Sequence, residues 1–176
     1  LILVFPQRKS LIRPAVFLVI FLNFSRTIFL ILSQYFLWKN SEFSRFLLPP
    51  YQPINYFLGY VSYRFVLPFI FPLVVGFIFY FLTKFINRLF KERLFYPEEP
   101  FLIFYGIIIV AHPLWIIYIF SSIILAILLY LLALAFRKIK FGELFSLYYL
   151  WLLVAFFVLI FNKYLINLPL IKTLKF

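Results

Sequence analysis

Very few side chains in this sequence could take part in chemistry. The chain has one histidine, His112, no cysteine and no aspartate, and its five acidic residues are all glutamates. Metal cages built from Cys and His and Ser–His–Asp triads are therefore excluded, and four scattered glycines cannot build a phosphate-binding loop. We expect no bound metal and no cofactor. The remaining candidates are His112, which precedes Pro113, and Arg26, which stands alone in an apolar run.

The composition places these residues in a membrane protein. Apolar residues make up 66% of the chain and the mean hydropathy is +1.09, far above a soluble domain. Residues 113–136 contain no charged side chain, and this length of helix crosses a hydrocarbon core of ~30 Å. A short basic loop at 137–140 separates this run from a second charge-free run at 144–162. Two spanning helices joined by a cytoplasmic loop are the predicted arrangement.

Three more apolar segments lie upstream. The run 14–38 predicts a span with Arg26 near its centre. Residues 46–63 contain three prolines in their first half, at positions 49, 50 and 53, so only 54–63 can be regular helix. This piece is predicted to be a partial span or a re-entrant segment. The run 65–83 predicts a span with prolines in its first two turns.

Residues 84–112 are predicted to form a surface segment. Its first half, 84–100, has the amphipathic spacing of a helix that lies along a membrane. The part 101–111 is too short for a helical span and rich in β-favouring residues, which favours an extended or re-entrant segment. We therefore predict one membrane domain: an all-α, polytopic integral membrane protein with about four transmembrane helices plus a proline-broken fifth segment.

Charge suggests both a partner and an orientation. The net charge is +12, but basic residues sit at the ends of apolar runs, which disfavours nucleic acid and favours anionic phospholipid headgroups. Placing Arg8–Arg13, Arg64 and Arg137–Lys140 in the cytoplasm requires 46–63 to cross the membrane. The basic residues of 84–93 then lie outside, which opposes that assignment.

Arg26 is the stronger binding candidate. An unpaired guanidinium at mid-membrane depth costs at least ~2.5 kcal/mol, and no predicted span holds an acidic residue that could pair with it. Backbone carbonyls at the proline breaks, water in a cavity or a lipid phosphate bound in a bidentate manner would supply a partner, and the phosphate is favoured. The alternative is two interfacial half-helices that meet at Arg26. His112 could be a base or a headgroup ligand. A polar residue hydrogen-bonded to water or headgroups at the interface is the favoured interpretation of His112.

The segment 112–163 also resembles the C-terminal half of a known enzyme family. It contains a His-Pro pair at the head of a helix, a loop of the form R-K-x-K-x-G and a helix beginning G-x-L-F-x-L-Y, here His112-Pro113, Arg137–Gly142 and Gly142–Tyr148. These motifs are similar to those of bacterial phosphatidylglycerol:prolipoprotein diacylglyceryl transferase. Weaker similarities are Phe85-Ile86-Asn87, which resembles the family's N-F-I-N, and Arg26, which resembles the arginine of its G-R pair.

The resemblance covers about half of the chain and implies a multi-pass protein of the bacterial inner membrane. It implies Arg26, Asn87 and His112 as lipid-binding residues, with His112 as the only candidate for catalysis, and a lipoprotein or another membrane protein as a possible partner. The apolar start at Leu1–Phe5, followed by basic residues, is typical of a helix whose beginning is missing. The chain would then be an N-terminally incomplete relative.

The family's functional positions are mostly replaced. Ile117 and Tyr118 stand where the family has Tyr and Glu, and the signature H-G-G-L-I-G is missing near Tyr56–Tyr60. Four further Arg or Glu positions are apolar, namely Phe81, Leu89, Phe156 and Ile160. We therefore expect a catalytically degenerate relative that retains phospholipid binding. The alternative, from another class, is a small membrane subunit of a transporter or assembly complex.

Overall fold

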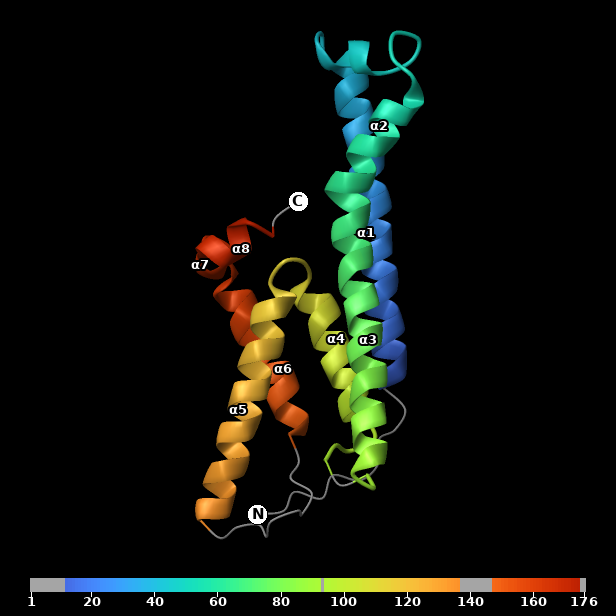
Figure 1. The fold of residues 1–176 in the computed structure, drawn as a ribbon. Helices are drawn as coiled ribbons and strands as arrows, with labels where there is room; N and C mark the ends of the chain where they lie inside the picture. Colours follow the sequence, from blue (N-terminus) through green and yellow to red (C-terminus); the bar gives the residue numbers. More distant parts are fainter. Residues whose placement is uncertain (1–11, 93, 137–146, 175–176) are drawn as a thin grey trace.

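Helices are the only regular elements in the computed structural model, which describes residues 12–92, 94–136 and 147–174 (Figure 1). They are α1 (Ile12–Asn40), α2 (Ile54–Val61), α3 (Leu67–Leu89), α4 (Glu99–Val110), α5 (Trp115–Ala135), α6 (Tyr148–Ile160), α7 (Asn162–Leu165) and α8 (Pro169–Lys172), with a 3-10 helix η1 (Ser44–Leu47) and a π-helix η2 (Ser62–Val66). Three helical stretches are long and apolar enough to cross a membrane: Pro14–Asn40, Ile54–Leu89 and Trp115–Ala135. The prediction of an all-helical membrane protein is confirmed at this level.

The second stretch differs from its prediction. Where the sequence suggested a partial span at 54–63 and a separate span at 65–83, α2, η2 and α3 follow one another as one helical stretch from Ile54 to Leu89. The π-helix η2 lies directly before the first proline of α3. A wider turn relieves the clash between a proline ring and the preceding carbonyls, so the helix continues through the prolines instead of ending there.

The predicted surface segment 84–112 also differs from the structure, which divides it between two helices. Residues 84–89 complete α3, a loop follows, and Glu99–Val110 form α4. Of the two alternatives predicted for 101–111, the extended segment is wrong, because α4 is a helix and most of its residues are buried. The re-entrant alternative stays a prediction. It packs against both α3 and α6. Helix contacts on several sides of α4 outweigh the β-favouring character of its side chains.

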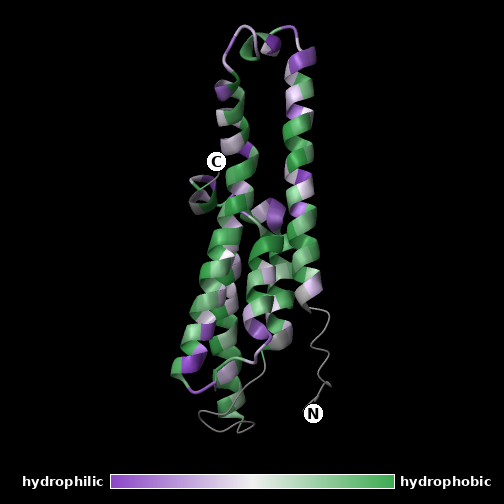
Figure 2. Ribbon diagram, turned by 90° about the vertical axis from the view of Figure 1, so that its right-hand side faces the viewer, coloured by the Kyte–Doolittle hydropathy of each residue, from purple (hydrophilic) through white to green (hydrophobic). Residues whose placement is uncertain are grey.

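The core of the molecule surrounds α4. Buried side chains of α4, α5 and α6 form the largest cluster, which includes Ile107, Tyr118 and Val154. By contrast, α1 presents most of its large apolar side chains outward, and Figure 2 shows that hydrophobic residues extend along most of the length of the long helices. Apolar exposure on this scale is typical of helices that contact lipid.

Two glycines allow α4 to lie against its neighbours. A Cβ atom on Gly106 would collide with the hydroxyl of Tyr118, which is fully buried on α5. A Cβ atom on Gly76 of α3 would come within 2.8 Å of the Phe104 ring. The close approach of α4 to α3 and to α5 therefore depends on glycine at these two positions.

Gly106→Ala is expected to lower the free energy of unfolding by about 1–3 kcal/mol, because the new methyl group must displace the Tyr118 ring. Gly59→Ala is the matched control: a Cβ there meets nothing within 4 Å, and alanine is the better helix former. Adding Tyr118→Phe to Gly106→Ala should restore part of the lost stability, because it removes the hydroxyl that the new methyl group would meet. Thermal unfolding in detergent measures all three. Equal stability of the Gly106 and Gly59 variants would contradict the proposed contact.

Candidate functional site

Arg26 lies at the midpoint of α1, and its side chain is exposed among exposed apolar neighbours such as Phe24 and Phe29. Within the described residues it makes no hydrogen bond or ion pair. The structure therefore contains the predicted helix, and the charge of Arg26 lies at its centre as predicted. Its role as a lipid contact remains a prediction.

A second arginine, Arg64, lies near the level of Arg26. Helix α1 runs antiparallel to α2 and α3, and its register is set by two ring contacts: Phe24 with Phe69 at 6.2 Å and Tyr35 with Phe57 at 5.6 Å. This register places Arg26 opposite a position within about one helical turn of Arg64. Arg64 is exposed and lies in η2. In the sequence analysis Arg64 divided two spans and was assigned to the cytoplasm. The structure instead places Arg64 within one continuous helical stretch, which the prolines of the sequence did not suggest.

Asn87 serves the loop that follows α3. Its amide nitrogen donates to the carbonyl of Phe95 at 2.9 Å, and its side-chain oxygen accepts from the backbone N–H groups of Leu94 and Phe95 at 3.1 and 3.0 Å. This loop contains two residues with positive φ, Lys91 and Glu92. Three hydrogen bonds from one amide hold such a loop closed, so we interpret Asn87 as structural.

His112 lies in the link between α4 and α5. Its Nε2 donates to the carbonyl oxygen of Leu174 at 2.7 Å, and its ring meets Phe71 edge-on at 5.5 Å. Burial lowers the pKa of His112 below its usual 6.5, although the bond to the Leu174 carbonyl acts in the opposite direction. A neutral His112 therefore ties the C-terminal segment to the link between two core helices.

The structure does not bring Arg26, Asn87 and His112 together. Asn87 belongs to the end of α3 that leads into α4, whereas His112 follows the far end of α4. A helix of 12 residues, about 18 Å long, separates those two levels. Among the described residues, no contact connects the side chains of Arg26, Asn87 and His112 with one another.

One buried acidic side chain went unrecognised in the sequence. Glu99 begins α4, lies outside the three candidate spans and is 0% exposed. Its Oε1 accepts the backbone N–H of Leu147, the residue before α6, at 2.9 Å, while Oε2 has no hydrogen-bond partner. The indole of Trp151 lies near enough to lower the pKa of Glu99, but its N–H does not have the geometry of a hydrogen bond.

Burial dominates the electrostatics of this site. Desolvation raises the pKa of Glu99 to about 7, against the lowering effect of the Leu147 N–H and of Trp151. The sequence offered one weak signal, a glutamate placed directly before a proline and the apolar run of α4. Its partner lies 48 residues further along the chain, so the buried contact could not be foreseen.

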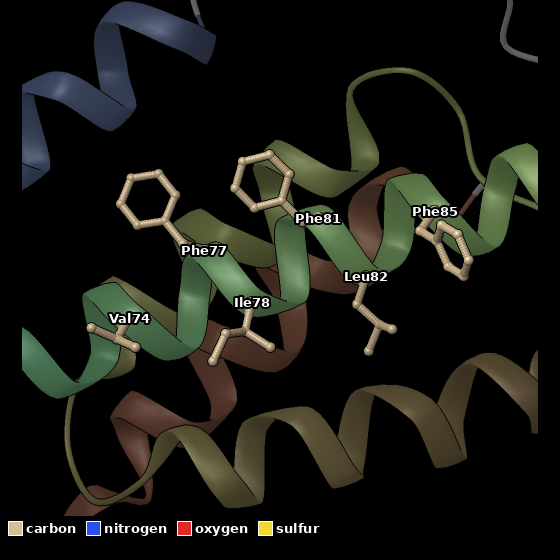
Figure 3. Close-up of a pocket in the computed structure, with 6 residues that line it drawn as sticks. All are labelled: Val74, Phe77, Ile78, Phe81, Leu82 and Phe85. Carbon is tan, nitrogen blue, oxygen red and sulfur yellow. The ribbon is translucent and has the colours of Figure 1, made fainter.

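A shallow apolar hollow of about 590 Å³ lies along the outer surface of α3 (Figure 3). Figure 3 shows the side chains that line it, which are Val74, Phe77, Ile78, Phe81, Leu82 and Phe85. The lining contains no charged or hydrogen-bonding side chain, so the hollow suits a hydrocarbon chain or an apolar helix.

No protein-family model, no curated protein and no solved structure matches the chain. The fold and the exposed apolar surface define the class of the protein, a helical protein embedded in a membrane. The family resemblance of the segment 112–163 therefore stays a hypothesis.

Asn87→Ala is expected to lower the free energy of unfolding by about 1–3 kcal/mol, since backbone groups of the loop lose three hydrogen bonds. Asn87→Asp keeps the acceptor but loses the donor to Phe95, and should fall between the alanine variant and the parent. Chemical unfolding in detergent measures the effect. If Asn87→Ala kept full stability but lost bound phospholipid, the residue would be a ligand and not a loop support.

Proposed function

We propose that this chain is a multi-pass integral membrane protein that binds an anionic phospholipid through Arg26, as a catalytically degenerate relative of the prolipoprotein diacylglyceryl transferases. The observation that carries the proposal is the position of Arg26, exposed at mid-helix among apolar side chains. Arg64 lies at nearly the same level on the neighbouring helix. The guanidinium of Arg26 has no counter-charge among the described residues, and a lipid phosphate fits its planar fork.

The replaced family positions support a binding role over catalysis. Phe81 and Leu89, which stand at Arg and Glu positions of the family, are exposed on α3. Phe156 and Ile160 are likewise exposed on α6. Side chains that face outward on two different helices do not line a common site. Diacylglyceryl transfer needs a base and phosphate recognition together, and the described residues do not provide both in one place.

The helix arrangement also suggests an orientation. In Figure 1, α1 begins and α3 ends toward the same end of the bundle, and α5 ends there too. The segments attached to these helix ends carry ten of the seventeen basic residues, namely Arg8, Lys9, Arg13, Lys84, Arg88, Lys91, Arg93, Arg137, Lys138 and Lys140. The positive-inside preference assigns this end to the cytoplasm.

This orientation removes a conflict in the sequence interpretation. Because Ile54–Leu89 is one crossing, the basic residues at 84–93 fall on the same side as those of 8–13 and 137–140. Helices α4 and α6, with 12 and 13 residues, are shorter than the three candidate spans and pack among them without crossing the membrane on their own. We place the protein in the bacterial inner membrane.

One observation favours a second candidate function, that of a small membrane subunit. The apolar hollow on α3 presents six side chains to the outside, a surface on which the helix of a partner could pack. Phospholipid binding and subunit assembly predict different effects of Arg26 substitutions, because the hollow does not include Arg26.

Arg26→Leu is expected to remove the anionic phospholipid that co-purifies with the parent, as measured by native mass spectrometry. Arg26→Lys keeps the charge but loses the bidentate fork, and should retain the lipid about ten-fold more weakly. Lys39→Leu is the control, because Lys39 is an exposed basic residue in the last turn of the same helix. If the Arg26→Leu variant carries as much phospholipid as the parent, the arginine is structural.

Orientation can be checked with single cysteines, since the chain contains none. A cysteine at Ile139, between α5 and α6 and outside the described residues, should resist a membrane-impermeant maleimide in intact cells. A cysteine at Gln52, in the exposed turn between α1 and α2, should be labelled. The reverse pattern would invert the topology.

A further inference from the structure

Glu99 occupies a position where two helices begin. It is the first residue of α4, and its carboxyl accepts the backbone N–H of Leu147, the residue at which α6 starts. Leu147 itself makes no side-chain capping hydrogen bond. Helix N-termini favour a negative charge. The side chain is nevertheless 0% exposed, and only one of its two carboxyl oxygens is bonded.

The surroundings of the carboxyl provide no counter-ion among the described residues. On its own helix the nearest charge is Glu98, which acts against ionisation. On α3, the ammonium group of Lys84 lies over the rings of Tyr80 at 4.5 Å and Phe101 at 5.9 Å. On α6, the groups that face Glu99 are the N–H of Leu147 and the indole of Trp151. A buried carboxylate without a cation costs several kcal/mol unless it takes up a proton.

From this geometry we propose that Glu99 is a proton-binding site that controls how α6 docks on α4. With a proton on Oε2 the carboxyl is neutral, its burial costs little, and Oε1 still accepts the Leu147 N–H. When the proton leaves for water, one negative charge remains between the two helices. The start of α6 then loosens, because water can reach the carboxylate only if that contact opens. This role does not depend on the proposed lipid binding at Arg26.

The direction of the pH effect follows from the pKa of Glu99, which is raised from 4.5 to about 7. Between these two values the folded chain holds a proton that the unfolded chain has lost. Stability therefore falls as the pH rises through this window and levels off above about 7. His112 has a lowered pKa, so its titration below pH 6.5 changes stability in the opposite direction. Between pH 6.5 and 8, where the fall is completed, the Glu99 effect is free of the His112 contribution.

Infrared difference spectroscopy of the intact chain in detergent tests the site directly. The parent should show a protonated-carboxyl band that disappears with a midpoint near pH 7. This band should be absent from Glu99→Gln and unchanged in Glu98→Gln, the matched control on the neighbouring residue. If the parent shows no protonated carboxyl above pH 5.5, the proposal is wrong. This measurement does not depend on whether a variant folds.

Hydrogen exchange tests the coupling to α6. The protection of backbone amides at 147–151 should fall by about fourfold from pH 6.5 to pH 8 in the parent, after correction for intrinsic exchange rates. In Glu99→Gln, which stays neutral, the corrected protection should not change with pH. Amides of α1 serve as an internal reference. A parental loss of protection that persists in the Gln variant would overturn the assignment.

Discussion

The enclosure of α4 is the constraint on which the rest of the structure depends. This helix is apolar around its whole circumference, so it can be stable only if other helices cover it. Helix α3 covers one side and α6 another, and α5 crosses close enough for Tyr118 to lie against Gly106. The other helices can present apolar faces to lipid because α4 already supplies a buried surface for them to pack on.

The same constraint explains which elements the sequence could predict. The runs 14–38 and 113–136 match α1 and α5 within about two residues at each end, because long charge-free segments have few alternatives in hydrocarbon. The prediction of an extended segment at 101–111 failed because β-favouring residues express only a local preference. Buried backbone groups need hydrogen-bond partners, and α4 supplies them within a helix. The predicted division at Arg64 is wrong because a π-turn precedes Pro68 and the helix continues through Pro72 without an end.

The role of a side chain could be predicted from the sequence only where the residue is the single charge in an apolar run. Arg26 is the one charge within a long apolar run, so the sequence predicts both its position in the helix and the free-energy cost of placing it in a membrane. Asn87 acts on groups seven and eight residues away, in a loop whose shape no motif reveals. The role of Glu99 depends on Leu147, which is distant in sequence and is brought near by the packing of α6 on α4. Long-range packing is what a single sequence does not reveal.

Arg26 and Glu99 have opposite charges, yet the fold does not allow them to neutralise each other. Helices α1 and α4 run in the same direction, and Val16 packs in one cluster with Phe104. At 1.5 Å per residue, Arg26 lies about 15 Å beyond that contact, and Glu99 lies about 7 Å before it. An ion pair across more than 20 Å is negligible even in a medium of low polarity, because the attraction must repay the desolvation of both groups. Each charge must therefore be neutralised separately. In our proposal the exposed guanidinium takes an anion from the lipid. The buried carboxylate has no cation among the described residues, and a proton is the partner that we propose for it.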